Sequence, residues 1–144
     1  MIINFTVRGI PKGQPRPRAF ARGGKVRMYD AGTAEAWKGA IALAAKPHLP
    51  ALPLDKPIKL TIEHYMPRPK NHYGTGKNAG AIKFGAPTLH TSKPDIDNLC
   101  KSVLDSLTQL GVWLDDDQVY FIEASKIYGS PTGAIIKIET FNPL

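Results

Sequence analysis

The sequence contains a single cysteine, Cys100, and only four histidines among its 144 residues. One cysteine excludes an intramolecular disulfide and suits a reducing compartment, so we expect a cytoplasmic protein. The histidines are scattered and no second cysteine accompanies Cys100, so a structural zinc site is not expected. No apolar run is long enough to span a membrane, and the N-terminus lacks the pattern of a signal peptide.

Acidic residues are scarce in the first part of the chain. Residues 1–93 contain 16 Lys and Arg but only 4 Asp and Glu, a balance of +12, whereas residues 94–144 contain 3 and 8, a balance of −5. A basic body around an acidic cluster is typical of a metal-dependent nuclease, in which cations hold phosphates and acids hold metal. The alternative is that excess lysine serves only solubility. This alternative is less favoured, because residues 1–93 and residues 94–144 carry net charges of opposite sign.

Repeats, low-complexity segments and clear domain boundaries are also missing. The length and the apolar content of 42% fit one domain of modest core, residues 1–144. The longest segment without a predicted element is a basic loop at about 67–92. Loops of this length are usually functional or disordered.

The acidic residues that are present gather around a predicted helix in residues 94–119. Its apolar positions recur at spacings of four, four and three, which gives one apolar face: Leu99, Val103, Leu107 and Leu110. Asn98 or Asp97 can cap its start, and Gly111 stands where a helix-terminating glycine belongs. Acids stand at both ends of this helix: Asp95 and Asp97 before it, and Asp115, Asp116 and Asp117 after it.

Carboxylates held close together repel one another unless a cation lies between them. Hard oxygen ligands select Mg²⁺, Mn²⁺ or Ca²⁺, and carboxylate-bound Mg²⁺ supports hydrolysis of phosphodiesters. Lys101, one turn into the helix, could contact a phosphate or stabilise developing charge. Either acidic end alone is better explained as a helix cap or a solvated turn. The two ends together, joined by a helix in a basic chain, favour a metal site.

Two basic segments are candidates for contacting DNA. The first is an arm rich in proline and glycine at residues 9–27, predicted as a loop or short hairpin that contacts phosphates through Arg16, Arg18 and Arg22; a disordered solvated loop is an equal alternative. The second is the 67–92 loop, whose lysines, including Lys70 and Lys77, alternate with aromatic residues. Its GTGKN stretch fails the phosphate-loop pattern, so a nucleoside triphosphate site is rejected.

The remaining elements predict an α+β fold. Residues 3–7 alternate as a strand, residues 33–46 form a helix capped by Thr33, and residues 58–66 form a second strand with His64 on its buried face. After the acidic centre come strands at 119–128 and 134–141, expected to form an antiparallel hairpin. The order β-α-β-α-β-β indicates a single domain with a mixed β-sheet and two helices packed against it.

The stretch PDIDNLCKSVLDSL, followed by GVWLDDDQV, resembles the RusA family of Holliday junction resolvases, which are dimeric Mg²⁺-dependent endonucleases of bacteria and prophages. The resemblance is sharp over residues 93–119 and weaker but continuous elsewhere. It implies that Asp95, Asp97 and Asp116 are catalytic acids that bind Mg²⁺, with Mn²⁺ as a substitute, and that Lys101 is an essential lysine. Asp115 matches the first of the family's acidic pair, and Asp117 is an additional acid, which leaves open which member of the triplet faces the metal.

The resemblance also implies a homodimer that resolves four-way DNA junctions by paired symmetric cuts, in recombination and repair. The alternative function is a non-catalytic protein that binds branched DNA, its acids being capping and turn residues. A nucleotide-sugar transferase, which can also use an Asp-x-Asp pair, is less favoured because the chain is short and lacks a nucleotide-binding βαβ pattern. An EF-hand is excluded, since Cys100 stands where that loop requires glycine.

Overall fold

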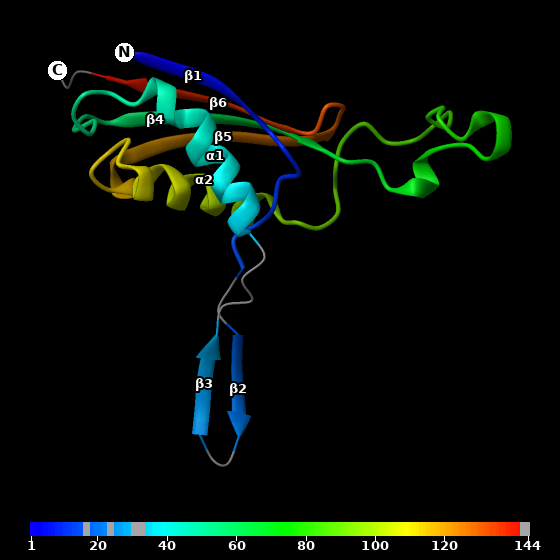
Figure 1. Ribbon diagram of the computed structural model, residues 1–144, viewed down its shortest axis with the longest axis horizontal. Helices are drawn as coiled ribbons and strands as arrows, with labels where there is room; N and C mark the ends of the chain where they lie inside the picture. The colour runs from blue at the N-terminus through cyan, green and yellow to red at the C-terminus, as the bar shows by residue number, and fades with distance from the viewer. Residues whose placement is uncertain (16–17, 23–24, 30–33, 142–144) are drawn as a thin grey trace.

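A computed structural model of the chain describes residues 1–15, 18–22, 25–29 and 34–141, without the side chains of the segments 18–22 and 25–29. Four strands form a mixed sheet in the order β1-β6-β4-β5 (Figure 1). These strands are β1 (Ile2–Arg8), β4 (Ile58–Met66), β5 (Val119–Tyr128) and β6 (Gly133–Thr140). β4 runs parallel to β5, while β6 runs antiparallel to both β1 and β4.

Two helices, α1 (Glu35–Ala45) and α2 (Ile96–Leu110), pack on one face of this sheet and against each other. The core is made by alternate residues of the strands, such as Phe5, Leu60 and Ile136, together with Trp37 of α1 and Val103 of α2. The α+β prediction and its order of strands and helices are confirmed, with one additional hairpin. In the described segments, no helix combines the length and the apolar character needed to cross a bilayer.

The prediction that the last two strands pair as a hairpin is wrong. β4 lies between β5 and β6, so the connection 129–132 passes the end of β4, where the Gly129 N–H donates to the Met66 carbonyl at 3.1 Å. A central place suits β4, because Ile58, Leu60 and Ile62 are fully buried and the backbone is then satisfied on both edges. β4, α2 and β5 together make a β-α-β unit, although without a glycine-rich first turn.

Element ends differ from prediction in small ways. α2 begins at Ile96 with Asp95 at the N-cap position, so Asp97 lies in the first turn, and the Asp95 side chain makes no capping hydrogen bond. Gly111 ends the helix as predicted, with φ of 86°, a conformation that glycine adopts without steric penalty. α1 has Ala34 at its N-cap, and the predicted cap, Thr33, is outside the described residues. β6 begins one residue earlier than predicted and ends at Thr140.

The basic arm, predicted as a loop or short hairpin, forms a short hairpin that extends away from the sheet and helices (Figure 1). Its strands β2 (Arg18–Arg22) and β3 (Lys25–Tyr29) are antiparallel, with Arg18 paired to Tyr29 and Arg22 to Lys25. Arg16 is outside the described residues. The 67–92 loop extends from another side of the body and contains two short 3₁₀ helices, η2 (Lys70–His72) and η3 (Gly76–Asn78).

Candidate active site

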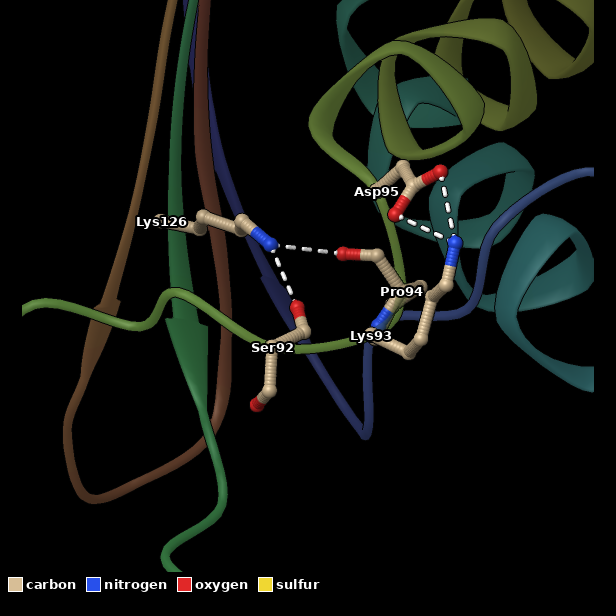
Figure 2. A network of polar contacts seen from close by, with 5 residues as sticks. All are labelled: Ser92, Lys93, Pro94, Asp95 and Lys126. Carbon is tan, nitrogen blue, oxygen red and sulfur yellow. Dashed lines mark hydrogen bonds and ion pairs between the residues drawn. The ribbon is translucent and has the colours of Figure 1, made fainter.

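The N-terminal end of α2 is held by contacts that involve two lysines (Figure 2). Lys126 of β5 donates to the carbonyl oxygens of Ser92 at 2.6 Å and Pro94 at 2.8 Å, which ties the segment entering the helix to the edge of the sheet. Lys93 donates to both carboxylate oxygens of Asp95 at 2.9 Å. The position of Asp95 is therefore set from the sheet by Lys126 and from its own segment by Lys93.

The second acidic segment is a turn built around Gln118. A short 3₁₀ helix, η4 (Asp116–Gln118), follows Asp115. The Gln118 side-chain oxygen accepts from the backbone N–H groups of Leu114 at 2.9 Å and Asp115 at 3.0 Å, and its amide donates to the Leu54 carbonyl at 2.9 Å. Asp115 accepts from the Asp117 N–H at 3.2 Å. Asp115 thus serves the turn, and Gln118 fastens the turn to the chain before β4.

Asp116 is close enough to α2 for the charges of that helix to affect its carboxyl group. Desolvation by partial burial raises its pKa, and a hydrogen bond with Asp115 and the negative charges of Asp115 and Asp105 raise it further, while the Lys101 ammonium opposes them. Lys101 Nζ lies 3.4 Å from Asp105 on the same helix. Asp97, Lys101 and Asp105 are spaced by four, so they share one helix face. The fold therefore brings Asp116 within electrostatic reach of Lys101, 15 residues earlier in the sequence, and of Asp105, 11 residues earlier.

The other predicted acids stand at the N-terminal end of α2. Asp97 contributes, after burial, to the raised pKa of the Cys100 thiol, so its charge acts on the first turn of the helix. In the part of the chain that the structure describes, no three His, Cys, Asp or Glu side chains form a group that could hold a metal ion. The assignment of Asp95, Asp97 and Asp116 as metal ligands stays a prediction.

The donor chemistry nevertheless fits a hard divalent cation. The side chains concerned offer only carboxylate oxygens, the ligands that Mg²⁺ prefers. Like charges from Asp115 and Asp105 disfavour the ionised form of Asp116, and a cation among these oxygens would reverse that effect. The residues therefore suit Mg²⁺ better than zinc or copper.

A cleft of about 850 Å³ borders the Asp95 end of the site. It lies among the segment 10–15, the ends of β4 and β5, and the segment that enters α2, and Lys12, Arg68 and Lys93 contribute positive charge to its walls. The root of the basic arm is fastened to α2, since the Ser102 hydroxyl donates to the Lys12 carbonyl at 2.8 Å and the Gln14 N–H donates to the Asn98 backbone carbonyl at 2.9 Å. The N-terminus of α2 lies between the hairpin and the 67–92 loop (Figure 1).

Some of the predicted DNA-binding residues therefore flank the acids. Arg18 and Arg22 belong to the hairpin strand β2, while Lys70 and Lys77 lie in η2 and η3 of the long loop. The hairpin and the 67–92 loop extend from the body in different directions (Figure 1). This arrangement would let a nucleic acid contact both segments and pass over the α2 N-terminus.

Sequence reasoning missed the residues that position this site. Lys93 was visible directly before the acidic motif, but its pairing with Asp95 is local geometry that periodicity does not report. Lys126 and Gln118 act through contacts over 32 to 64 residues, for which a single sequence carries no signal. Gly13 had a weak signal as a glycine in the basic arm; a Cβ there would stand 2.8 Å from Asn98 Cβ, so α2 and the arm could not approach as closely.

Comparison with known proteins agrees with this arrangement. The family model described as "Endodeoxyribonuclease RusA" matches residues 8–139 of the chain. That range includes both acidic segments, α2 and the two basic segments. The chain belongs to the RusA family of endodeoxyribonucleases. The expected family resemblance is thereby confirmed, and the protein is a nuclease of this class.

Individual relatives cover different shares of the RusA-family chain. The protein YqaN of Bacillus subtilis (strain 168), described as uncharacterized, is 37% identical over 126 residues, 88% of this chain and 87% of YqaN. The crossover junction endodeoxyribonuclease RusA of Escherichia coli (strain K12) is 27% identical over 105 residues, 73% of this chain and 69% of that protein. That of Lactococcus phage r1t is 46% identical over 37 residues, 26% of this chain and 28% of that protein.

Proposed function

We propose that this RusA-family nuclease acts on four-way DNA junctions and cuts them in a reaction that depends on Mg²⁺, with Mn²⁺ as a substitute. The observation that carries the proposal is the placement of Asp116 beside Lys101 and Asp105 on α2, in a chain whose relatives include proteins named crossover junction endodeoxyribonucleases. A purely structural turn would not require Asp116 to face other carboxylates, because this arrangement disfavours its ionised form.

In this proposal the acids and the lysine have separate roles. Asp95, Asp97 and Asp116 would hold the cation, which supplies charge stabilisation at the scissile phosphate and activation of water. Lys101, more than half exposed with its ammonium beside Asp105, would neutralise charge that develops on the phosphate oxygens. Asp115 and Gln118 would keep Asp116 in place through the turn contacts.

The basic segments would supply most of the binding affinity. Residues 1–93 carry a balance of +12, and phosphate contacts from arginine and lysine dominate non-specific binding of DNA. Arg16, Arg18 and Arg22 of the arm, with Lys70 and Lys77 of the long loop, are the proposed contacts. Because one chain carries one acidic site and resolution needs two opposed cuts, we further propose that the active species is a homodimer with C₂ symmetry.

The test compares cleavage of a synthetic four-way junction and a linear duplex built from the same strands, each with Mg²⁺ and with EDTA. We expect cleavage of the junction only, and only with the metal. Asp97→Asn should abolish cleavage and retain junction binding, because binding comes mainly from the basic residues. Glu35→Gln, which removes an exposed acid from the first turn of α1, is the matched control and should cleave normally.

Junction binding without cleavage under any divalent metal would favour the alternative, a non-catalytic protein that binds branched DNA. Equal cleavage of junction and duplex would contradict structure selectivity and leave the nuclease assignment in place. An Asp97→Asn protein that cuts at the wild-type rate would show that the site has been assigned to the wrong residues.

A further inference from the structure

A tight turn of the 67–92 loop presents an aromatic side chain to solvent. The Ala86 N–H donates to the Lys83 carbonyl at 3.1 Å, which closes a four-residue turn with Phe84 and Gly85 at its centre. Gly85 has φ of 83°, the value that the third position of a type II turn requires. Phe84 has a relative exposure of 107%, so its ring is as open to water as in an extended peptide.

The segment before this turn is closed by its own hydrogen bonds. The Gly74 N–H donates to the Ala81 carbonyl at 2.9 Å, and the Lys83 N–H donates to the His72 carbonyl at 2.8 Å. Residues 72–83 therefore form a small hairpin-like unit, and the chain leaves it directly into the turn. Phe84 is thus presented by a segment with a defined backbone.

Both ends of the loop are fastened to the last residue of β5. The Arg68 guanidinium lies 5.1 Å from the ring centroid of Tyr128 and donates to the Pro87 carbonyl at 2.7 Å. The ring of His72 meets that of Tyr128 edge-on at 4.9 Å, and the Tyr128 N–H donates to the Thr88 carbonyl at 2.9 Å. A loop held in this way loses little conformational freedom when it binds a partner.

The charge of the loop selects a partner that is an anion. Residues 67–92 contain no Asp or Glu and four basic side chains: Arg68, Lys70, Lys77 and Lys83. The two ends of the loop also form walls of the cleft of about 850 Å³ that borders Asp95. An anionic membrane would match the charge, but the chain is a nuclease of the RusA family, and DNA that reaches Asp95 must pass this loop.

The phenyl ring narrows the partner further. Single exposed apolar side chains are common on protein surfaces, but this one stands directly after Lys83 in a segment suited to phosphates. An aromatic ring gains nothing from a phosphate, whereas it stacks well on the face of a nucleobase. Inside a linear duplex each base face is covered by the next base pair. At a branch point the continuous stack ends, and proteins insert apolar side chains, including Phe, at such openings.

We propose that Phe84 stacks on a base face exposed at the branch point of DNA, and that this contact makes the nuclease prefer branched DNA to linear duplex. The proposal rests on the proposed function and adds to it the residue that recognises the branch. Lys83, one residue earlier, contacts a phosphate beside that base and has no part in the preference, because phosphates are present in both kinds of DNA.

The experiment measures binding by fluorescence anisotropy in EDTA, with three labelled DNAs: a four-way junction, a duplex with a two-base bulge, and a linear duplex. Phe84→Ala should weaken binding to the junction and to the bulged duplex roughly 5- to 100-fold, the range for loss of one base–aromatic stack. Its affinity for the linear duplex should not change. The slope of log K against log salt should also stay the same, because no charge is removed. Phe84→Trp should keep the preference.

Two further variants are the controls. Leu43→Ala removes another exposed apolar side chain, on α1 and 74% exposed, and should bind all three DNAs as the wild type does. Lys83→Ala should weaken binding to all three DNAs to a similar extent and reduce the magnitude of the salt slope by about 0.9. Circular dichroism melting of each variant should match the wild type, since these side chains are exposed.

A direct test places the fluorescent base analogue 2-aminopurine at the branch point of the junction. Its emission depends on what stacks on it, so the wild type and Phe84→Trp should change the emission on binding. Phe84→Ala at saturating concentration should change it far less. The same analogue in the middle of an arm should respond equally to all three proteins.

Several results would overturn the proposal. They are a Phe84→Ala protein that keeps full affinity for the junction and the bulged duplex, one that loses affinity for linear duplex by the same factor, and a wild type with equal affinity for the three DNAs. Phe84-dependent binding to phosphatidylserine vesicles, with DNA binding unchanged, would assign the ring to a membrane instead. Cleavage with Mg²⁺ decides the proposed function separately. A Phe84 effect on the bulged duplex would support the stacking role even if the junction were not cut.

Discussion

Lys101 has two possible roles that the structure makes distinct. Its ammonium lies 3.4 Å from Asp105, one turn further along α2, and its charge also lowers the pKa of Asp116. An exposed ion pair at this helical spacing is worth about 0.3 to 0.5 kcal/mol. A cation that neutralises charge in the transition state is worth far more to the rate than to folding.

Lys101→Ala should therefore lower the single-turnover rate of junction cleavage by roughly 10²-fold or more, the scale for loss of one transition-state charge partner. The melting temperature should change little. Lys137→Ala is the matched control, because Lys137 forms a comparable ion pair with Glu139 at 3.8 Å on the sheet. A wild-type rate of junction cleavage by Lys101→Ala would contradict the catalytic role, and the ion pair with Asp105 would then be the role of Lys101.

His64 is a second residue whose state follows from its surroundings. It is fully buried on β4, Nδ1 donates to the Ser125 carbonyl at 3.1 Å, and no hydrogen-bond partner of Nε2 is found in the described residues. Its pKa is lowered to about 4, mainly by burial and also by the nearby Lys126 charge, against the opposing effect of the hydrogen bond to Ser125. The neutral ring belongs to the core, in agreement with the prediction of a buried strand-face histidine.

Stability should therefore depend on pH through His64. The unfolded chain takes up a proton near pH 6.5 and the folded chain only near pH 4, so the full stability is present above pH 6.5 and is lost progressively as the pH falls to 4. The total loss is about 3 kcal/mol. Urea unfolding at several pH values measures it.

The control separates His64 from the other titrating groups. His64→Leu should make the unfolding free energy depend less steeply on pH between pH 6.5 and pH 4 than in the wild type. His48→Gln should leave it intact, because His48 is exposed. A curve for His64→Leu that follows the wild type would assign the pH dependence to other residues.

At the scale of elements, local pattern predicted α2 and β4 well and strand pairing badly. The repeat of Leu99, Val103 and Leu107 fixed the buried face of α2, and all three are fully buried. The short link between β5 and β6 suggested a hairpin, yet both strands pair with β4 instead. Pairing depends on which strand can be buried between two neighbours, and a single sequence contains no direct record of that choice.

The candidate site, like the fold, could be predicted from local sequence pattern only in part. Its acids and Lys101 were predictable because they stand near the ends and along one face of a periodic helix. The contacts that set their positions were not, since Lys126 reaches Pro94 and Gln118 reaches Leu54 only in the folded chain. The residues proposed for the chemistry follow a pattern in the sequence, while the residues that hold them in place follow none.

At the scale of the whole molecule, basic and acidic residues are concentrated in different parts of the chain. The +12 balance of residues 1–93 includes the hairpin and the long loop, which extend on different sides of the α2 N-terminus (Figure 1). The −5 balance of residues 94–144 includes the acids that α2 and η4 carry. The proposed DNA contacts in the hairpin and the long loop therefore lie in other segments than the proposed metal ligands.

This division predicts how binding depends on salt. Each phosphate contact contributes about 0.9 to the slope of log K against log salt for duplex DNA, through release of counterions. Replacing Arg16, Arg18 and Arg22 together with Ala should therefore reduce the magnitude of the slope by about 2 to 3, and junction affinity should fall most at low salt. Fluorescence anisotropy with a labelled junction, in EDTA over a range of salt concentrations, measures the slope without cleavage.

The matched control removes the same charge from elsewhere on the chain. Lys46→Ala, Lys56→Ala and Lys137→Ala combined also lower the net charge by three. Lys46 lies on the short 3₁₀ helix η1 (Lys46–His48), Lys56 lies before β4 and Lys137 lies on β6, all of them elements away from the hairpin (Figure 1). If binding depends only on overall charge, the two triple variants should weaken binding to the same extent. The slope of log K against log salt should then be the same for both variants. If the arm contacts phosphates, only the arginine variant shows the smaller slope. An unchanged slope in that variant would contradict the role of the hairpin, and affinity would then have to come from the 67–92 loop and the walls of the cleft.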